Sequence, residues 1–233
     1  MNKTGWRWLA VVAAVAVSPV VGLAQGTDLG NRVLALKQSL ETDQGALRKY
    51  EWIETTVVSL KGEEKSRTQN RCYYGADGKL QKVPVAAQQA EMPGGLRGKV
   101  AQRKKEELTE YMQKAVAMVQ RYVPPVPASL QKSFQSGKTT VQVLEPERRG
   151  RLDFRDYLLP GDLLGVEVNL TNNRILGMQV ATYLEKPEDA VSLAVRFATL
   201  QNGTGYPAQV TLDAPKEQVR VVTENSGYRP VAR

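Results

Sequence analysis

The fold is decided by residues 166–184, VEVNLTNNRILGMQVATYL, where apolar and polar residues alternate on both sides of a polar triplet at 171–173. Asn-rich triplets of this kind form tight turns. Strict alternation is typical of a strand with one buried and one solvated face. The stretch therefore predicts an antiparallel hairpin that packs one face against a core.

The same period of two extends outward from this hairpin. Seven short segments between 139 and 221 alternate in this way, and brief connections between them favour antiparallel pairing of neighbours. Upstream, 50–60, 66–74 and 80–85 also read as strands, with an Asp-Gly turn before the last of them. A sheet of about ten strands is expected, and such a sheet must twist and curl.

Two amphipathic helices are expected to cover the dry face of this sheet. One is predicted over 28–43 and the other over 105–122, where a narrow apolar seam ends at the proline run 124–127. The seam of the second helix consists of Leu108, Met112, Ala115, Val119 and Tyr122. The predicted fold class is α+β: a curled antiparallel sheet, or half-barrel, with helices packed on its concave face. Because neither half has a complete core, 25–233 is interpreted as one domain.

Residues 1–24 have the pattern of a secretory signal peptide. Lys3 and Arg7 precede a nine-residue apolar run at 9–17, and Gly22 and Ala24 place small residues before a cleavage point at Gln25. The alternative is a membrane anchor, but the run is too short to cross about 30 Å of hydrocarbon as a helix. We expect export to the periplasm.

The composition excludes much catalytic chemistry. The chain has 233 residues, a net charge of +8, no His and one Cys. Without His there is no Ser-His-Asp or Cys-His machinery and no His-based zinc site. One Cys allows no internal disulfide. We therefore expect no catalytic residue, no metal and no cofactor. Export, and few aromatic residues beside the basic ones, argue against nucleic acid as a partner.

The hairpin at 166–176, VEVNLTNNRIL, resembles the V-x-V-D-x-x-T-x-x-I-L hairpin of the periplasmic lipoprotein-localisation carriers, the LolA/LolB-like superfamily. Residues 205–210, GYPAQV, resemble the later G-x-x-Y-P strand entry of these proteins. Asn169 stands where Asp is common, and the basic central helix has no matched counterpart. The resemblance implies a non-enzymatic half-barrel that holds acyl chains in an apolar concavity.

Two groups of residues are candidate binding sites. Apolar side chains on the late strands, with Trp52 across from them, either line an open cavity for lipid cargo or form a filled core under the helices: Trp52, Met178, Val180, Leu193, Val195, Phe197 and Val210. A basic run either binds anionic headgroups or an acidic partner, or is a solvated surface: Arg97, Lys99, Arg103, Lys104 and Lys105. Since cations are unfavourable at a helix N-terminus, a helix start nearer Glu106 is also an option.

The remaining reactive side chains have simpler interpretations. Cys72 lacks a His base and is interpreted as a small buried hydrophobe. Asp153 and Asp156 would face opposite sides of a strand, which argues against a catalytic carboxylate pair. The leading hypothesis is a periplasmic binding protein for a lipid or lipoprotein acyl chain, such as a lipoprotein-sorting carrier, with contact to a membrane surface. The alternative is an envelope interaction or scaffold module with a filled core, and a hydrolase comes third. The sequence leaves the oligomeric state open.

Overall fold

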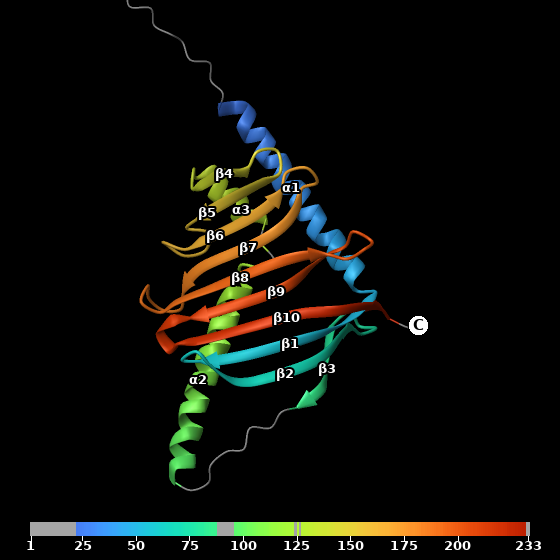
Figure 1. The fold of residues 1–233 in the computed structure, drawn as a ribbon. Coiled ribbons are helices and arrows are strands. Elements are labelled where there is room, and N and C mark those ends of the chain that lie inside the picture. Colours follow the sequence, from blue (N-terminus) through green and yellow to red (C-terminus); the bar gives the residue numbers. More distant parts are fainter. Residues whose placement is uncertain (1–21, 88–95, 124, 126, 232–233) are drawn as a thin grey trace, which may run out of the picture.

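A computed structural model describes the backbone of residues 22–87, 96–123, 125 and 127–231. Its centre is one sheet of ten strands in the order β3-β2-β1-β10-β9-β8-β7-β6-β5-β4, and every neighbouring pair is antiparallel (Figure 1). The edge strands β3 and β4 lie at opposite ends of this order, so the sheet is curled but open. This confirms the predicted half-barrel.

Ten strands were predicted, and their positions are close to those found. They are β1 Tyr50–Leu60, β2 Glu63–Tyr74, β3 Leu80–Ala87, β4 Thr139–Glu145, β5 Arg149–Arg155, β6 Leu163–Asn169, β7 Arg174–Tyr183, β8 Ala190–Thr199, β9 Gly205–Ala214 and β10 Val219–Pro230. Strands that follow one another in the chain pair, except β3 and β4 at the two edges, and β1 also pairs with β10. That single long-range pairing places the N-terminal hairpin beside the C-terminal strand.

The helices differ from the prediction in length and number. They are α1 Gly22–Leu47, α2 Leu96–Gln120, α3 Pro127–Gln135 and one 3₁₀ turn, η1 Pro215–Glu217. The proline run ends α2 as expected, but it also begins α3, which the sequence analysis missed. Proline is tolerated at the first position of a helix because the N–H it lacks would have no partner there.

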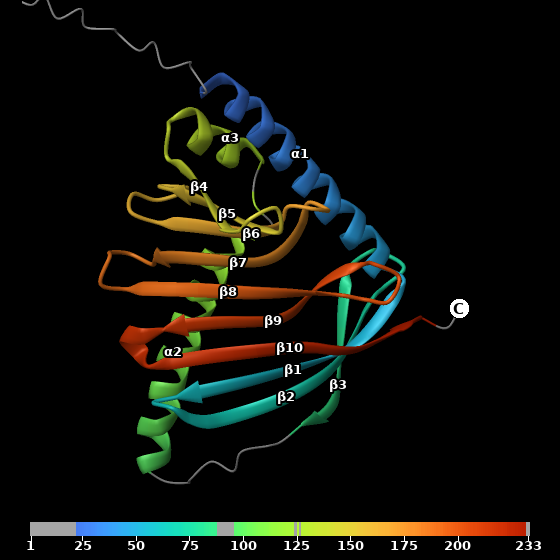
Figure 2. The same ribbon diagram turned by 45° about the horizontal axis from the view of Figure 1, so that its top comes forward.

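The helices lie on one side and at one end of the sheet. Helix α2 crosses behind the strands, α3 lies behind β4 and β5, and α1 runs past the strand ends (Figures 1 and 2). An ion pair between Asp43 of α1 and Arg174 of β7, 3.6 Å apart, helps to hold α1 there. The start of α1 at Gly22 falls within the predicted leader; residues 1–21 are outside the described part of the chain.

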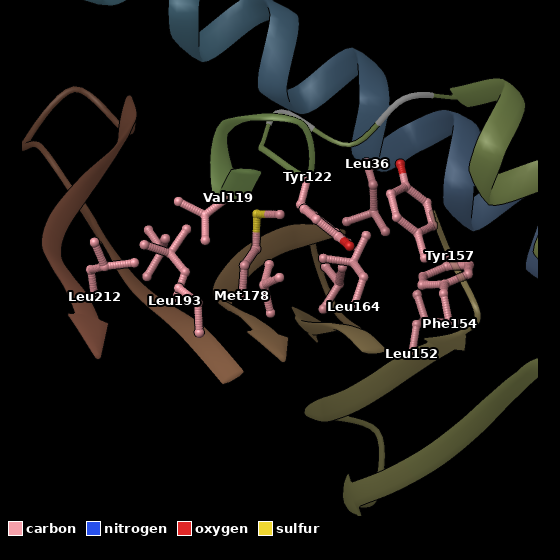
Figure 3. Packing of buried hydrophobic residues seen from close by; sticks show 14 of the residues in the cluster. Leu36, Val119, Tyr122, Leu152, Phe154, Tyr157, Leu164, Met178, Leu193 and Leu212 are labelled. Carbon is pink, nitrogen blue, oxygen red and sulfur yellow. The ribbon is translucent and has the colours of Figure 1, made fainter. Parts of the chain in front are cut away.

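The core lies between the concave face of β5–β9 and the helices (Figure 3). Ala115, Val119 and Tyr122 of the predicted seam are buried there, and Leu36 of α1 joins them. Leu108 and Met112, the other seam residues, are half-buried. The seam therefore continues along α2 beyond the part of the helix that is fully covered.

Candidate ligand-binding surface

Directly paired residues form two rows of side chains across the concave face. The first row runs Phe154, Leu164, Val180, Leu193, Leu212, Val221, Val58. The second runs Leu152, Val166, Met178, Val195, Val210, Thr223, Thr56, Thr68. Both rows are apolar from β5 to β9. The second becomes polar at β10, so the concave face has an apolar half and a more polar half.

Four of the predicted cargo residues lie in the covered, apolar half. Met178 and Val180 are each 2% exposed, Val195 is 4% exposed and Leu193 8%. They belong to the same buried cluster as Ala115 and Val119 of α2 (Figure 3). In this structure the protein's own side chains therefore cover these four residues.

The other two predicted residues of the late strands lie where this cover ends. Phe197 and Val210 are half-buried against the margin of the core, as is Val221 on β10. Val58 of β1 is directly opposite Val221 and is also half-buried. The α-helices pack mainly on β5, β7, β8 and β9 rather than on β10 and β1, which leaves Val221 and Val58 partly uncovered. We call Val58, Phe197, Val210 and Val221 the half-buried strip.

Polar side chains border the half-buried strip on β1, β3 and β10. The hydroxyls of Thr56 and Thr223 are 3.1 Å apart and share a hydrogen bond. Further along the same face, Lys82 Nζ donates to both carboxylate oxygens of Glu54, at 2.7 and 2.8 Å. An amphipathic molecule would thus meet aliphatic carbon on one side of this boundary and hydroxyl or charged groups on the other.

Trp52 is not brought together with the other predicted cargo residues. It is 7% exposed, stacks on Tyr228 with ring centroids 5.3 Å apart, and its Nε1 donates to Asn225 Oδ1 at 3.0 Å. The register of β1 and β10 shifts here, and Gly227 adopts a φ of 63°. Such a bulge bends the strand and re-aims its side chains. The pKa of Tyr228 is raised mainly by burial of its side chain, and the neighbouring Tyr206 is the second cause.

The end of α2 is attached to the sheet by a buried polar group that sequence reasoning missed. Tyr122 Oη donates to Asp162 Oδ2 at 2.6 Å and also contacts Thr182 Oγ1 at 2.8 Å. The same carboxylate accepts the backbone N–H groups of Leu158 and Leu159 at 2.9 and 2.7 Å. The pKa of Tyr122 is raised mainly by burial of its side chain, and the hydrogen bond to Asp162 is the second cause. The clue in the sequence was a tyrosine at the end of an apolar seam.

The basic run occupies the first turns of α2. The helix begins at Leu96, so the predicted start at 105, and the alternative near Glu106, are wrong. Lys and Arg are good helix formers, and the penalty for a cation near the helix N-terminus is only about 0.3–1 kcal/mol. The side chains of Arg97, Lys99, Arg103, Lys104 and Lys105 are outside the described residues.

Cys72, Asp153 and Asp156 make the contacts expected of residues that stabilise the fold. Cys72 is fully buried, and burial, followed by the charge of Glu54, raises the pKa of its thiol. Asp153 pairs with Arg151 Nε at 2.7 Å, and Asp156 with Lys138 Nζ at 2.8 Å.

Within the described part of the chain, no His, Cys, Asp and Glu residues form a group of three or more that could hold a metal ion. None of the helices described is both long and apolar enough to span a membrane.

Comparison with known proteins finds weak similarity to solved structures. No family model and no curated protein matches the chain. A LolA superfamily protein from Nitrosomonas europaea is similar, with 10% identity and a TM-score of 0.38 over 85% of this chain and 94% of that one. A DUF1329 family protein from Desulfovibrio piger has 10% identity and a TM-score of 0.37, over 89% and 92%. Both TM-scores are below 0.5, so the function of this chain must be argued from its own side chains.

Proposed function

We propose that this protein binds an acyl chain of a lipid or lipoprotein on the half-buried strip and acts as a non-enzymatic carrier in the periplasm. The observation that carries the proposal is the half-burial of Val58, Phe197, Val210 and Val221 at the margin of an otherwise covered core. An acyl chain laid on this surface would gain roughly 25 cal/mol for each Å² of apolar area removed from water. It would need no exact geometry, which suits a surface without directional groups.

The covered residues belong to the same proposal as a deeper part of the site. Met178, Val180, Leu193 and Val195 lie beneath α2, so cargo would reach them only after α2 moves aside. Trp52 would then border the polar end. We include in the proposal that the basic run at 97–105 serves anionic headgroups or a membrane surface. Export, cleavage before Gln25 and a single domain over 25–233 are also part of it.

A second candidate function is favoured by one observation. Because Leu164 and Val166 of β6 and Met178 and Val180 of β7 are each at most 4% exposed, the concave face is filled over these two strands. A filled core suits an envelope interaction or scaffold module that needs no small ligand. The two functions differ in one property, which is whether the purified protein holds lipid.

The test is native mass spectrometry and lipid extraction of protein purified from its own host, with binding of a fluorescent fatty acid. The variant is Val221→Glu on the half-buried strip. Its matched control is Val222→Glu, because Val222 is also half-buried but faces the opposite side of the sheet. We expect the affinity for the fatty acid to fall at least tenfold in Val221→Glu, about 1.4 kcal/mol, and to change little in Val222→Glu. Wild-type protein that neither carries nor binds lipid would refute the carrier and favour the scaffold.

A further inference from the structure

Strand β4 is an edge strand with two exposed valines. It lies at one end of the sheet, and among the described residues only β5 pairs with it. Val141 is 59% exposed and Val143 is 64% exposed, although both lie on the concave side like their partners Leu152 and Gly150. The apolar row of the concave face therefore continues to the edge of the sheet and ends there uncovered.

The backbone of β4 can accept another strand. Arg155 N donates to Lys138 O at 2.9 Å, which shows that the backbone groups of Lys138 point toward β5. The side to which the backbone N–H and C=O groups point alternates from one residue to the next along an antiparallel strand. The groups of Thr139, Val141 and Val143 therefore point away from β5. A row of such groups is a template for pairing with another chain.

The opposite edge of the sheet is protected, whereas β4 is not. Strand β3 contains Lys82 and Pro84, two residue types that blunt edge strands because one is charged and the other lacks an N–H. Residues 139–143, TTVQV, include neither a charge nor a proline. Of the two edge strands, only β4 therefore lacks the usual protection against pairing with another strand.

We propose that β4 pairs antiparallel with β4 of a second copy of this chain. An added strand must supply backbone partners and apolar side chains opposite Val141 and Val143. A two-fold axis perpendicular to the sheet keeps the concave faces together and, with Gln142 at the axis, places Val143 of each copy opposite Val141 of the other. The second copy thus supplies what the uncovered edge lacks.

The charges at the ends of β4 are compatible with this arrangement. The strand follows a basic residue, Lys138, and ends at Glu145 with Glu147 just beyond. In the proposed register Lys138 lies opposite Pro146 of the second copy, between these two carboxylates. Lys138 also pairs with Asp156 of its own chain, and Glu145 with Arg149 of its own chain. Parallel pairing would instead set like charges together. One strand pair buries less than the roughly 1,000 Å² expected of a stable interface, so the dimer is weak and its population depends on concentration.

The first test is sedimentation of the full chain, purified without added lipid, over a wide concentration range. Val141→Lys removes the apolar contact and adds a charge at the edge. Its matched control is Val85→Lys, because Val85 is 57% exposed on the other edge strand. We expect the wild type and Val85→Lys to dimerise alike and Val141→Lys to weaken the dimer at least tenfold. A wild type that stays monomeric, or equal weakening by both changes, overturns the proposal.

The second test reports the register. The backbone groups of Gln142 point toward β5, so at the axis the two copies of Gln142 form a non-hydrogen-bonded pair with Cα atoms about 4.5 Å apart. This distance suits a disulfide. Gln142→Cys should therefore cross-link to itself on mild oxidation, while fully buried Cys72 stays reduced. Thr140→Cys is the control, because its two copies would lie about 14 Å apart. A dimer without the cross-link at 142, or with an equal one at 140, contradicts the β4 pairing.

Discussion

Replacing Tyr122 by Phe tests the buried polar group that attaches α2 to the sheet. The change removes one hydroxyl that donates to Asp162 at 2.6 Å and contacts Thr182 at 2.8 Å. The ring and its packing against Tyr157 stay in place. The loss is therefore that of a buried hydrogen bond to a carboxylate, which contributes about 1.5–3 kcal/mol to the free energy of unfolding.

The assay is reversible urea unfolding followed by circular dichroism, with thermal unfolding as a second measurement. For a chain of this size the expected loss lowers Tm by about 3–12 °C. The matched control is Tyr183→Phe, which removes an exposed hydroxyl bonded to Pro160 O at 3.1 Å and should cost under about 0.5 kcal/mol. If both variants unfold at the same urea concentration, the Tyr122 hydroxyl does not hold α2 in place and the reasoning fails.

Three further outcomes are expected. The raised pKa of Tyr122 keeps the phenol protonated in the folded state where the unfolded chain ionises it, so the free energy of unfolding should fall above about pH 10. Tyr122→Phe should show a shallower fall in urea titrations across that range, and an unchanged slope would count against this cause. Cys72 should resist a thiol reagent until the protein unfolds, because its side chain is fully buried with a raised pKa; rapid labelling of native protein would contradict this. Gly45→Ala, in a helical position with no atom within 4 Å of the added Cβ, should stabilise by about 0.5–1 kcal/mol, whereas Gly205→Ala should destabilise because its Cβ would lie 2.5 Å from Asp43 Oδ2. Calorimetry that ranks these two variants in the opposite order would show that α1 does not dock as described.

The proposed site combines a part that the sequence anticipated with one that it missed. Phe197 and Val210 were predicted as cargo residues and lie on the half-buried strip. Val58 and Val221 were not singled out, although they complete the strip as a directly opposed pair. They are 163 residues apart in the chain, and nothing in either local pattern states that β1 and β10 are neighbours.

Local periodicity, by contrast, predicted the strands and the seam of α2 well. Alternation with a period of two marks a strand whichever partner it finds, and the spacing of Ala115, Val119 and Tyr122 marks the buried side of a helix whichever sheet it covers. The start of α2 was predicted wrongly because the unfavourable interaction between the basic side chains and the helix dipole is small. The third helix was missed because proline both ends and begins helices.

By itself, the sequence determined that this chain forms an open, curled sheet of alternating strands, because side-chain period is a property of each segment alone. Only the tertiary structure decided which part of the concave face is covered by α2, that Trp52 lies among tyrosines instead of beside Val195, and that β4 is left at an edge with two valines exposed. These features depend on contacts between segments far apart in the chain, where burial of apolar area selects the partner and no local pattern specifies it.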